Sequence, residues 1–114
     1  MDDSTAILMI KALDCLTARS IATAQNIANA GTPQYRPLRV TFEQALTDAA
    51  ARGDAAVRAV TPAVERIAAG GVDAELRLDL EMATASGTAG RYGAIVDILN
   101  RRLQMQSLAI TGNN

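Results

Sequence analysis

Apolar and small residues recur at alternating intervals of three and four along the first part of the chain. The row consists of Ala6, Met9, Leu13, Leu16, Ser20, Thr23, Ile27 and Ala30. This spacing is that of a coiled-coil seam and predicts an amphipathic helix. Asp3 or Ser4 is expected to cap its start, and Gly31 followed by Pro33 is expected to end it. We therefore expect an N-terminal helix over residues 1–30.

A second row with the same spacing occupies the last third of the chain. It consists of Ala85, Thr88, Tyr92, Ile95 or Val96, Leu99, Leu103, Gln106 and Ile110. The row predicts a C-terminal helix over residues 79–112, ended by Gly112. Leu76, Leu78 and Leu80 alternate with charged residues as in a short strand, and Asp73 or Asp79 is the alternative, as a cap of this helix. Glycines at 87, 90 and 93 lie inside it, each costing about 1 kcal/mol relative to alanine. They indicate either close approach of another backbone or a broken first half of the helix.

Residues 31–78 form a loop and a short middle segment in this interpretation. Pro33 and Pro37 favour an extended conformation over residues 31–40. A short helix should follow, with Thr41 as N-cap, Gln44 completing a capping box, and an end near Gly53. Its expected buried positions are Phe42, Ala45, Leu46 and Ala49. Residues 54–72 fit short helices or two weak strands equally well.

Two long amphipathic helices at the ends of a short chain predict an antiparallel hairpin. We expect an all-α fold in which the two helices pack as a coiled-coil-like pair within a single domain, residues 1–114. Two helices cannot cover apolar rows this wide, so some apolar surface should remain for partners.

The composition excludes several kinds of chemistry. The 114 residues include no histidine and one cysteine, which rules out histidine-based triads and a cysteine zinc site. Asp79 and Glu81 are expected to be exposed charges, because residues two apart on a helix do not face each other. Cys15 is expected to be a small buried hydrophobe rather than a reactive thiol. We therefore expect no enzyme activity, no cofactor and no metal.

Charge and hydropathy narrow the range of partners. The formal net charge is −1 and the basic residues are scattered, which does not resemble a nucleic-acid footprint. No apolar run reaches the ~20 residues that a membrane span needs. The start of the chain is acidic at Asp2 and Asp3 and lacks the form of a cleaved signal peptide. These features predict a cytoplasmic protein or one exported without a cleaved signal.

One segment is unusual for the end of an apolar helix. Residues 26–36 read Asn-Ile-Ala-Asn-Ala-Gly-Thr-Pro-Gln-Tyr-Arg, and helix-stop signals do not explain the two asparagines. Asparagine beside an interface can bond to a neighbouring chain and fix register. The segment resembles the N-terminal signature of flagellar basal-body rod and hook proteins. Thr32 and Pro33 followed by Tyr35 resemble the proximal rod proteins of the FlgB family.

The C-terminal half carries a matching resemblance to that family. It lies in the segments Glu81-Met82-Ala83, Arg91-Tyr92 with Ala94, and residues 109–112. Val40 to Glu43 also resemble the residues that follow the family's loop. The sequence departs from the family between Val72 and Leu80, and its glycine row replaces bulkier residues. The likeness covers both ends of the chain, about 70 residues.

The resemblance implies a structural subunit of the flagellar rod. Such a subunit assembles helically with itself and with other rod proteins around the export channel and transmits torque. It implies membrane-ring and rod-junction proteins and the flagellar type III export apparatus as partners, and a place in the periplasmic rod of the basal body. The expected subunit-interface residues are Asn26, Ile27, Asn29, Thr32, Pro33, Tyr35, Tyr92, Leu99, Leu103 and Ile110. The alternative is a soluble helical-hairpin adaptor or export chaperone that binds one partner helix.

Overall fold

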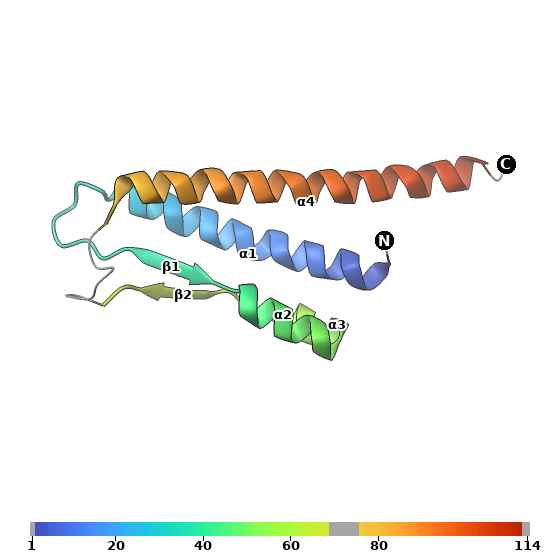
Figure 1. Cartoon of the computed structure of the whole chain (residues 1–114), viewed down its shortest axis with the longest axis horizontal. Coiled ribbons are helices and arrows are strands. Elements are labelled where there is room, and N and C mark those ends of the chain that lie inside the picture. Colours follow the sequence, from blue (N-terminus) through green and yellow to red (C-terminus); the bar gives the residue numbers. More distant parts are fainter. Residues whose placement is uncertain (1, 69–75, 113–114) are drawn as a thin grey trace.

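Two long antiparallel helices, α1 (Asp3–Ala28) and α4 (Leu78–Gly112), form most of the chain (Figure 1). Between them lie β1 (Leu38–Thr41), α2 (Glu43–Arg52), α3 (Asp54–Arg58) and β2 (Ala63–Arg66). The computed structural model describes residues 2–68 and 76–112. Asp73, one of the two residues expected to cap the last helix, lies outside the described residues.

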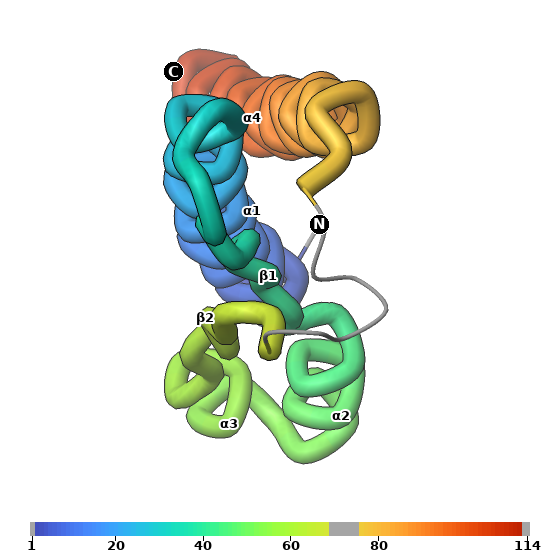
Figure 2. Tube along the Cα trace, turned by 90° about the vertical axis from the view of Figure 1, so that its left-hand side faces the viewer, coloured from blue at the N-terminus to red at the C-terminus, as the bar shows by residue number. Residues whose placement is uncertain are grey.

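The elements are arranged in three layers, with α1 in the middle. Helix α4 covers one side of α1, and the strands with α2 and α3 cover the other (Figure 2). The molecule is elongated, with principal extents of 64 × 27 × 14 Å. The predicted hairpin of long helices is therefore confirmed, with an additional layer built from the middle of the chain.

The prediction of an all-α chain is wrong in the middle segment. β1 pairs antiparallel with β2, and Val40 lies opposite Val64. The sequence left residues 54–72 open between helices and strands, and the described part of this range contains one of each, α3 and β2. Pro37 favours an extended conformation for the residue before it, and β-branched Val40 and Thr41 suit the strand that follows.

The predicted ends of α1 need correction. The N-cap is Asp2 rather than Asp3 or Ser4, and its side chain accepts a 2.8 Å hydrogen bond from the Thr5 backbone N–H. This bond lowers the pKa of Asp2. At the other end, Gly31 does not adopt the left-handed conformation, which is found instead at Gln34, with φ of 61°. The helix ends at Ala28 with Asn29 as its C-cap, whose backbone N–H bonds to the Gln25 and Asn26 carbonyls and whose Nδ2 donates to the Gln25 carbonyl.

Helix α2 also begins differently from the prediction. Its N-cap is Phe42, which makes no side-chain capping bond, and Thr41 belongs to β1. The expected capping box is therefore wrong, and Gln44 instead donates to the Asp48 carboxylate. The predicted end near Gly53 is confirmed; this glycine has a φ of 117°, which favours a residue without a side chain.

The hydrophobic core lies between α1 and the middle segment rather than between the two long helices. Cys15 and Leu16 of α1 are buried there against residues of β1, α2 and α3. The buried members from those elements are Val40, Phe42, Leu46, Ala49 and Val57. Ala45, which was expected among them, is exposed. The fully buried residues of α4 are Glu81 and Thr88, and Ile95, Val96 and Leu99 are half-buried, so this helix contributes little to the core.

Candidate functional site

Asn26 is the centre of a buried hydrogen-bond network at the end of α1. It is 1% exposed. Its Oδ1 accepts from the Leu38 backbone N–H and from the Tyr35 hydroxyl, both at 2.8 Å. Its Nδ2 donates to the Leu38 carbonyl at 2.9 Å and to Glu81 Oε2 at 3.0 Å. An amide offers two donors and two acceptor lone pairs, so all of its capacity is used within the chain.

Glu81 carries the network from α1 to α4 and β1. This carboxylate is 3% exposed. Besides the bond from Asn26, it accepts a 2.8 Å bond from the guanidinium of Arg39 on β1. The expectation that Glu81 is an exposed charge is therefore wrong, although Asp79 is exposed and pairs with Arg77. The two acids point to different sides of α4, as their spacing predicts. The buried one, Glu81, accepts a hydrogen bond from Asn26 and pairs with Arg39.

The remaining residues of the asparagine motif form local contacts. Asn29 Nδ2 donates to the Gln25 carbonyl at 2.9 Å, and the Thr32 hydroxyl donates to Asn29 Oδ1. Arg66 lies over the Tyr35 ring, 5.4 Å from its centre, as in a cation–π contact. Partners within the chain thus account for Asn26, Asn29 and Tyr35, which had seemed to need a neighbouring subunit. Their role at a subunit interface stays a prediction.

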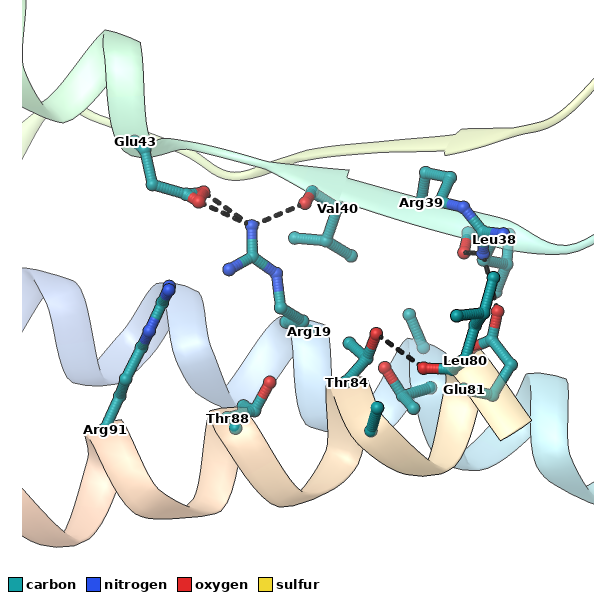
Figure 3. A pocket seen from close by; sticks show the side chains of 14 residues that line it. Arg19, Leu38, Arg39, Val40, Glu43, Leu80, Glu81, Thr84, Thr88 and Arg91 are labelled. Atoms are coloured by element: carbon teal, nitrogen blue, oxygen red, sulfur yellow. Dashed lines mark hydrogen bonds and ion pairs between the residues drawn. The ribbon is translucent and has the colours of Figure 1, made fainter. Parts of the chain in front are cut away.

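A groove of about 690 Å³ lies beside this network, between α4 and the β1–α2 segment (Figure 3). Arg19 rises from α1 on its floor and donates to the Val40 carbonyl at 2.8 Å and to both carboxylate oxygens of Glu43. The Arg19 guanidinium also lies 4.6 Å from the centre of the Phe42 ring. Partial burial raises the pKa of Glu43, but the Arg19 hydrogen bond and charge outweigh it, and the net pKa is lowered.

The groove continues along α1 towards the N-terminus. A second hollow of about 280 Å³ shares Glu43 and Arg91 with the first and is otherwise lined by apolar side chains. These are Ala12, Leu16, Phe42, Ala94 and Ile95. Arg91 extends from α4 beside the groove (Figure 3). It forms no hydrogen bond or ion pair with the residues that the structure describes. The groove is therefore mainly apolar at one end and carries a cation near its middle.

The last turns of α4 extend beyond the rest of the molecule (Figure 1). Arg102 pairs with Asp3 at 2.6 Å, which places it level with the start of α1. We call residues 103–112 the overhang. Its large apolar side chains are 59–70% exposed: Leu103, Met105, Leu108 and Ile110. The predicted interface residues Leu103 and Ile110 are thus on the surface of the chain.

The other predicted interface residues differ in exposure. Thr32, Pro33 and Tyr92 are exposed, whereas Ile27 and Leu99 are half-buried. The structure brings Asn26 and Tyr35 together, but it places the C-terminal residues far along α4 from them. Sequence reasoning missed the pairing of Arg19 with Glu43 and of Arg39 with Glu81, because single charges in a sequence give no signal of their partners.

Two other kinds of site, a metal centre and a membrane span, were considered for the residues that the structure describes. No cluster of three or more histidine, cysteine, aspartate or glutamate side chains is arranged to hold a metal ion. No helix within residues 2–68 or 76–112 combines the length and apolar character needed to cross a bilayer. Comparison of the chain with models of known protein families and with curated proteins found no significant match.

Proposed function

We propose that the chain is a structural subunit of the bacterial flagellar basal-body rod, and specifically of its proximal part. In this role it assembles helically around the export channel and transmits torque. The observation that carries the proposal is the buried network. Asn26 and Tyr35 come from one segment that resembles the rod-protein signature and Glu81 comes from a second, and Asn26 bonds to both of the others.

That convergence supports the proposal because the two segments are distant in sequence: Asn26 and Glu81 are 55 positions apart. Chance likeness of short motifs gives no reason for their side chains to share one site. Here the amide of Asn26 bonds to both of the others, and Arg39, which lies outside the segments that carry the resemblance, adds a bond to Glu81. The resemblance thus lies in residues that act together in the fold.

The exposed surface of α4 gives independent support. A subunit of a rod must present surface to neighbours, and exposed large apolar side chains are candidates for such contacts. The overhang exposes four of them at 59–70%, with Leu103 and Ile110 on one side of the helix and Met105 and Leu108 on the opposite side. Neighbouring copies, other rod proteins, and the membrane-ring and rod-junction proteins are the proposed partners, with delivery by the type III export apparatus.

The groove gives the alternative function its specific support. An adaptor or export chaperone would accept one partner helix there, as amphipathic helices bind hydrophobic grooves. The two functions differ in the final location of the chain. A rod subunit becomes part of the basal body, and an adaptor remains in a finite complex with its partner.

The test is to purify basal bodies from a flagellated cell that carries the chain with a small internal tag at Gly53, in the turn between α2 and α3. We expect mass spectrometry and labelled imaging to find the chain in the rod, and deletion of the gene to abolish both rods and swimming. A control strain carries the same tag on a chain with Asn26→Ala and Glu81→Ala. Normal rods in the deletion strain, or a chain found wholly outside basal bodies, would exclude the rod function.

A further inference from the structure

Two surfaces of the chain match in length, although they lie at different places on it. The floor of the groove runs along α1 from Ala12 to Thr23, about 16 Å at 1.5 Å per residue. The overhang, residues 103–112, is one helical segment about 15 Å long. The overhang is continuous with the helix that forms one wall of the groove, so it cannot fold back into the groove of its own chain.

The two surfaces also match in chemistry. The overhang contains no ionisable side chain and exposes Leu103, Met105, Leu108 and Ile110. Arg19 on the floor of the groove already pairs with Glu43. The end of the groove towards the start of α1 is mainly apolar and is available to receive such a segment. The last carbonyl groups of a helix attract cations. Arg91, beside the groove, offers one.

Gly87 explains how a helix can approach the wall. It lines the groove, and a Cβ placed on it would meet nothing within 4 Å, so nothing in its own chain requires a glycine there. Inside a helix, glycine is unfavourable relative to alanine. The absence of a side chain at this position leaves room for a second backbone at close range.

We propose that the overhang of one copy docks in the groove of a second copy of this chain. The inference rests on the proposed function and names the contact through which copies would join. The two surfaces differ, so the contact is heterologous. Repeating it adds copies in one direction and, where the rotation between copies does not close a ring, gives an open helical array rather than a closed dimer.

Cross-linking of the purified full-length protein tests the contact directly. Copies carrying Thr84→Cys in the groove are mixed with copies carrying Leu108→Cys in the overhang, under mild oxidation at millimolar protein concentration. We expect a disulfide-linked pair of chains. The matched control replaces Thr84→Cys by Met82→Cys, which is exposed on the same helix but does not line the groove. Its yield should be at least fivefold lower.

A second pair of variants does not depend on disulfide geometry. Gly87→Leu fills the groove, whereas Gly93→Leu adds the same side chain to an exposed position outside it. Both replace a helix-interior glycine by a better helix former, so both should remain folded by circular dichroism. We expect sedimentation to show at least tenfold weaker self-association for Gly87→Leu and no loss for Gly93→Leu.

The proposal is overturned if Gly87→Leu associates like the unchanged chain, if both cysteine pairs cross-link equally, or if the unchanged chain stays monomeric at millimolar concentration. Capture of an unrelated helix by the groove in place of a second copy would also overturn it and would favour the adaptor. These outcomes leave the rod function open. The rod function has a separate test, and absence of the chain from purified basal bodies would exclude it.

Discussion

Asn26 and Glu81 lie 55 positions apart in the sequence and share a buried hydrogen bond of 3.0 Å. The bond joins the last turn of α1 to the first turn of α4. Arg39 adds β1 to the same carboxylate, so three layers of the molecule meet at one pair of side chains. A buried polar pair of this kind favours one arrangement of the helices, because sliding α4 along α1 would break the Asn26–Glu81 bond and leave the buried carboxylate without one of its donors.

Asn26→Ala should lower the free energy of unfolding by about 2–4 kcal/mol. The change leaves the Leu38 amide, the Tyr35 hydroxyl and part of the Glu81 carboxylate without their partner. Each such loss costs about 1–3 kcal/mol for a buried group, and Leu38 and Tyr35 are half-buried, so water offsets part of the sum. Urea denaturation of the purified protein measures it. Asn29→Ala is the control and should cost only ~0.5–1 kcal/mol, because its bonds are local to the helix end. Equal effects of the two changes would contradict a central role for Asn26.

Arg39→Met should destabilise the chain by about 1–3 kcal/mol, because it leaves the buried Glu81 carboxylate with Asn26 as its remaining donor. Arg39 is itself partly exposed, so the effect should stay below that of breaking a fully buried pair. The double variant Arg39→Met with Glu81→Met should cost less than the sum of the two single changes. Strict additivity in this double-mutant cycle would show that the two residues do not interact in solution.

Stability should fall on acidification, partly through Glu43. The net pKa of this carboxyl group is lowered in the folded chain. A lowered folded pKa contributes stability above the unfolded value of ~4.3, and this contribution is lost as the pH falls through the folded pKa. Measured between about pH 6 and pH 3, Glu43→Gln should show a shallower loss of stability. The pair is partly exposed, so the difference should be no more than ~1 kcal/mol. An unchanged slope would exclude the contribution.

The Cys15 thiol should react slowly in the folded chain. Its side chain is fully buried against Leu16 and Phe42, and burial raises the pKa of the thiol. Thiolate is the reactive form, so both effects slow the reaction with a soluble thiol reagent. We expect the rate to rise at least a hundredfold in denaturing urea. Fast reaction under native conditions would mean that α1 separates readily from the middle segment.

Removing residues 105–114 should leave the stability of the folded chain nearly unchanged. Met105, Leu108 and Ile110 are 70% exposed, and the Arg102–Asp3 pair is retained. The free energy of unfolding should change by no more than about 0.5 kcal/mol, as for other surface changes. Urea denaturation at low protein concentration measures it. A large loss would show that the overhang packs on its own chain, which would count against its availability to a second copy.

The sequence alone predicted the two long helices correctly, because their apolar rows repeat with the helical period over many turns. The end of α2 near Gly53 was equally readable, since glycine tolerates the positive φ that this turn adopts. The start of α2 could not be predicted from the sequence. Thr41 and Gln44 form a good capping pattern, but pairing of β1 with β2 holds Thr41 in the strand.

The tertiary structure alone decided which side chains belong together. Asn26 reads as a poor helix former and Glu81 as a surface charge, and local sequence gives no sign that each satisfies the other. The same holds for Arg19 and Glu43. Such pairs form only after the layers pack, because burial removes water and makes each polar group depend on a particular partner. The periodic pattern therefore determined the helices, and the packing of α1 between two layers determined the network and the groove.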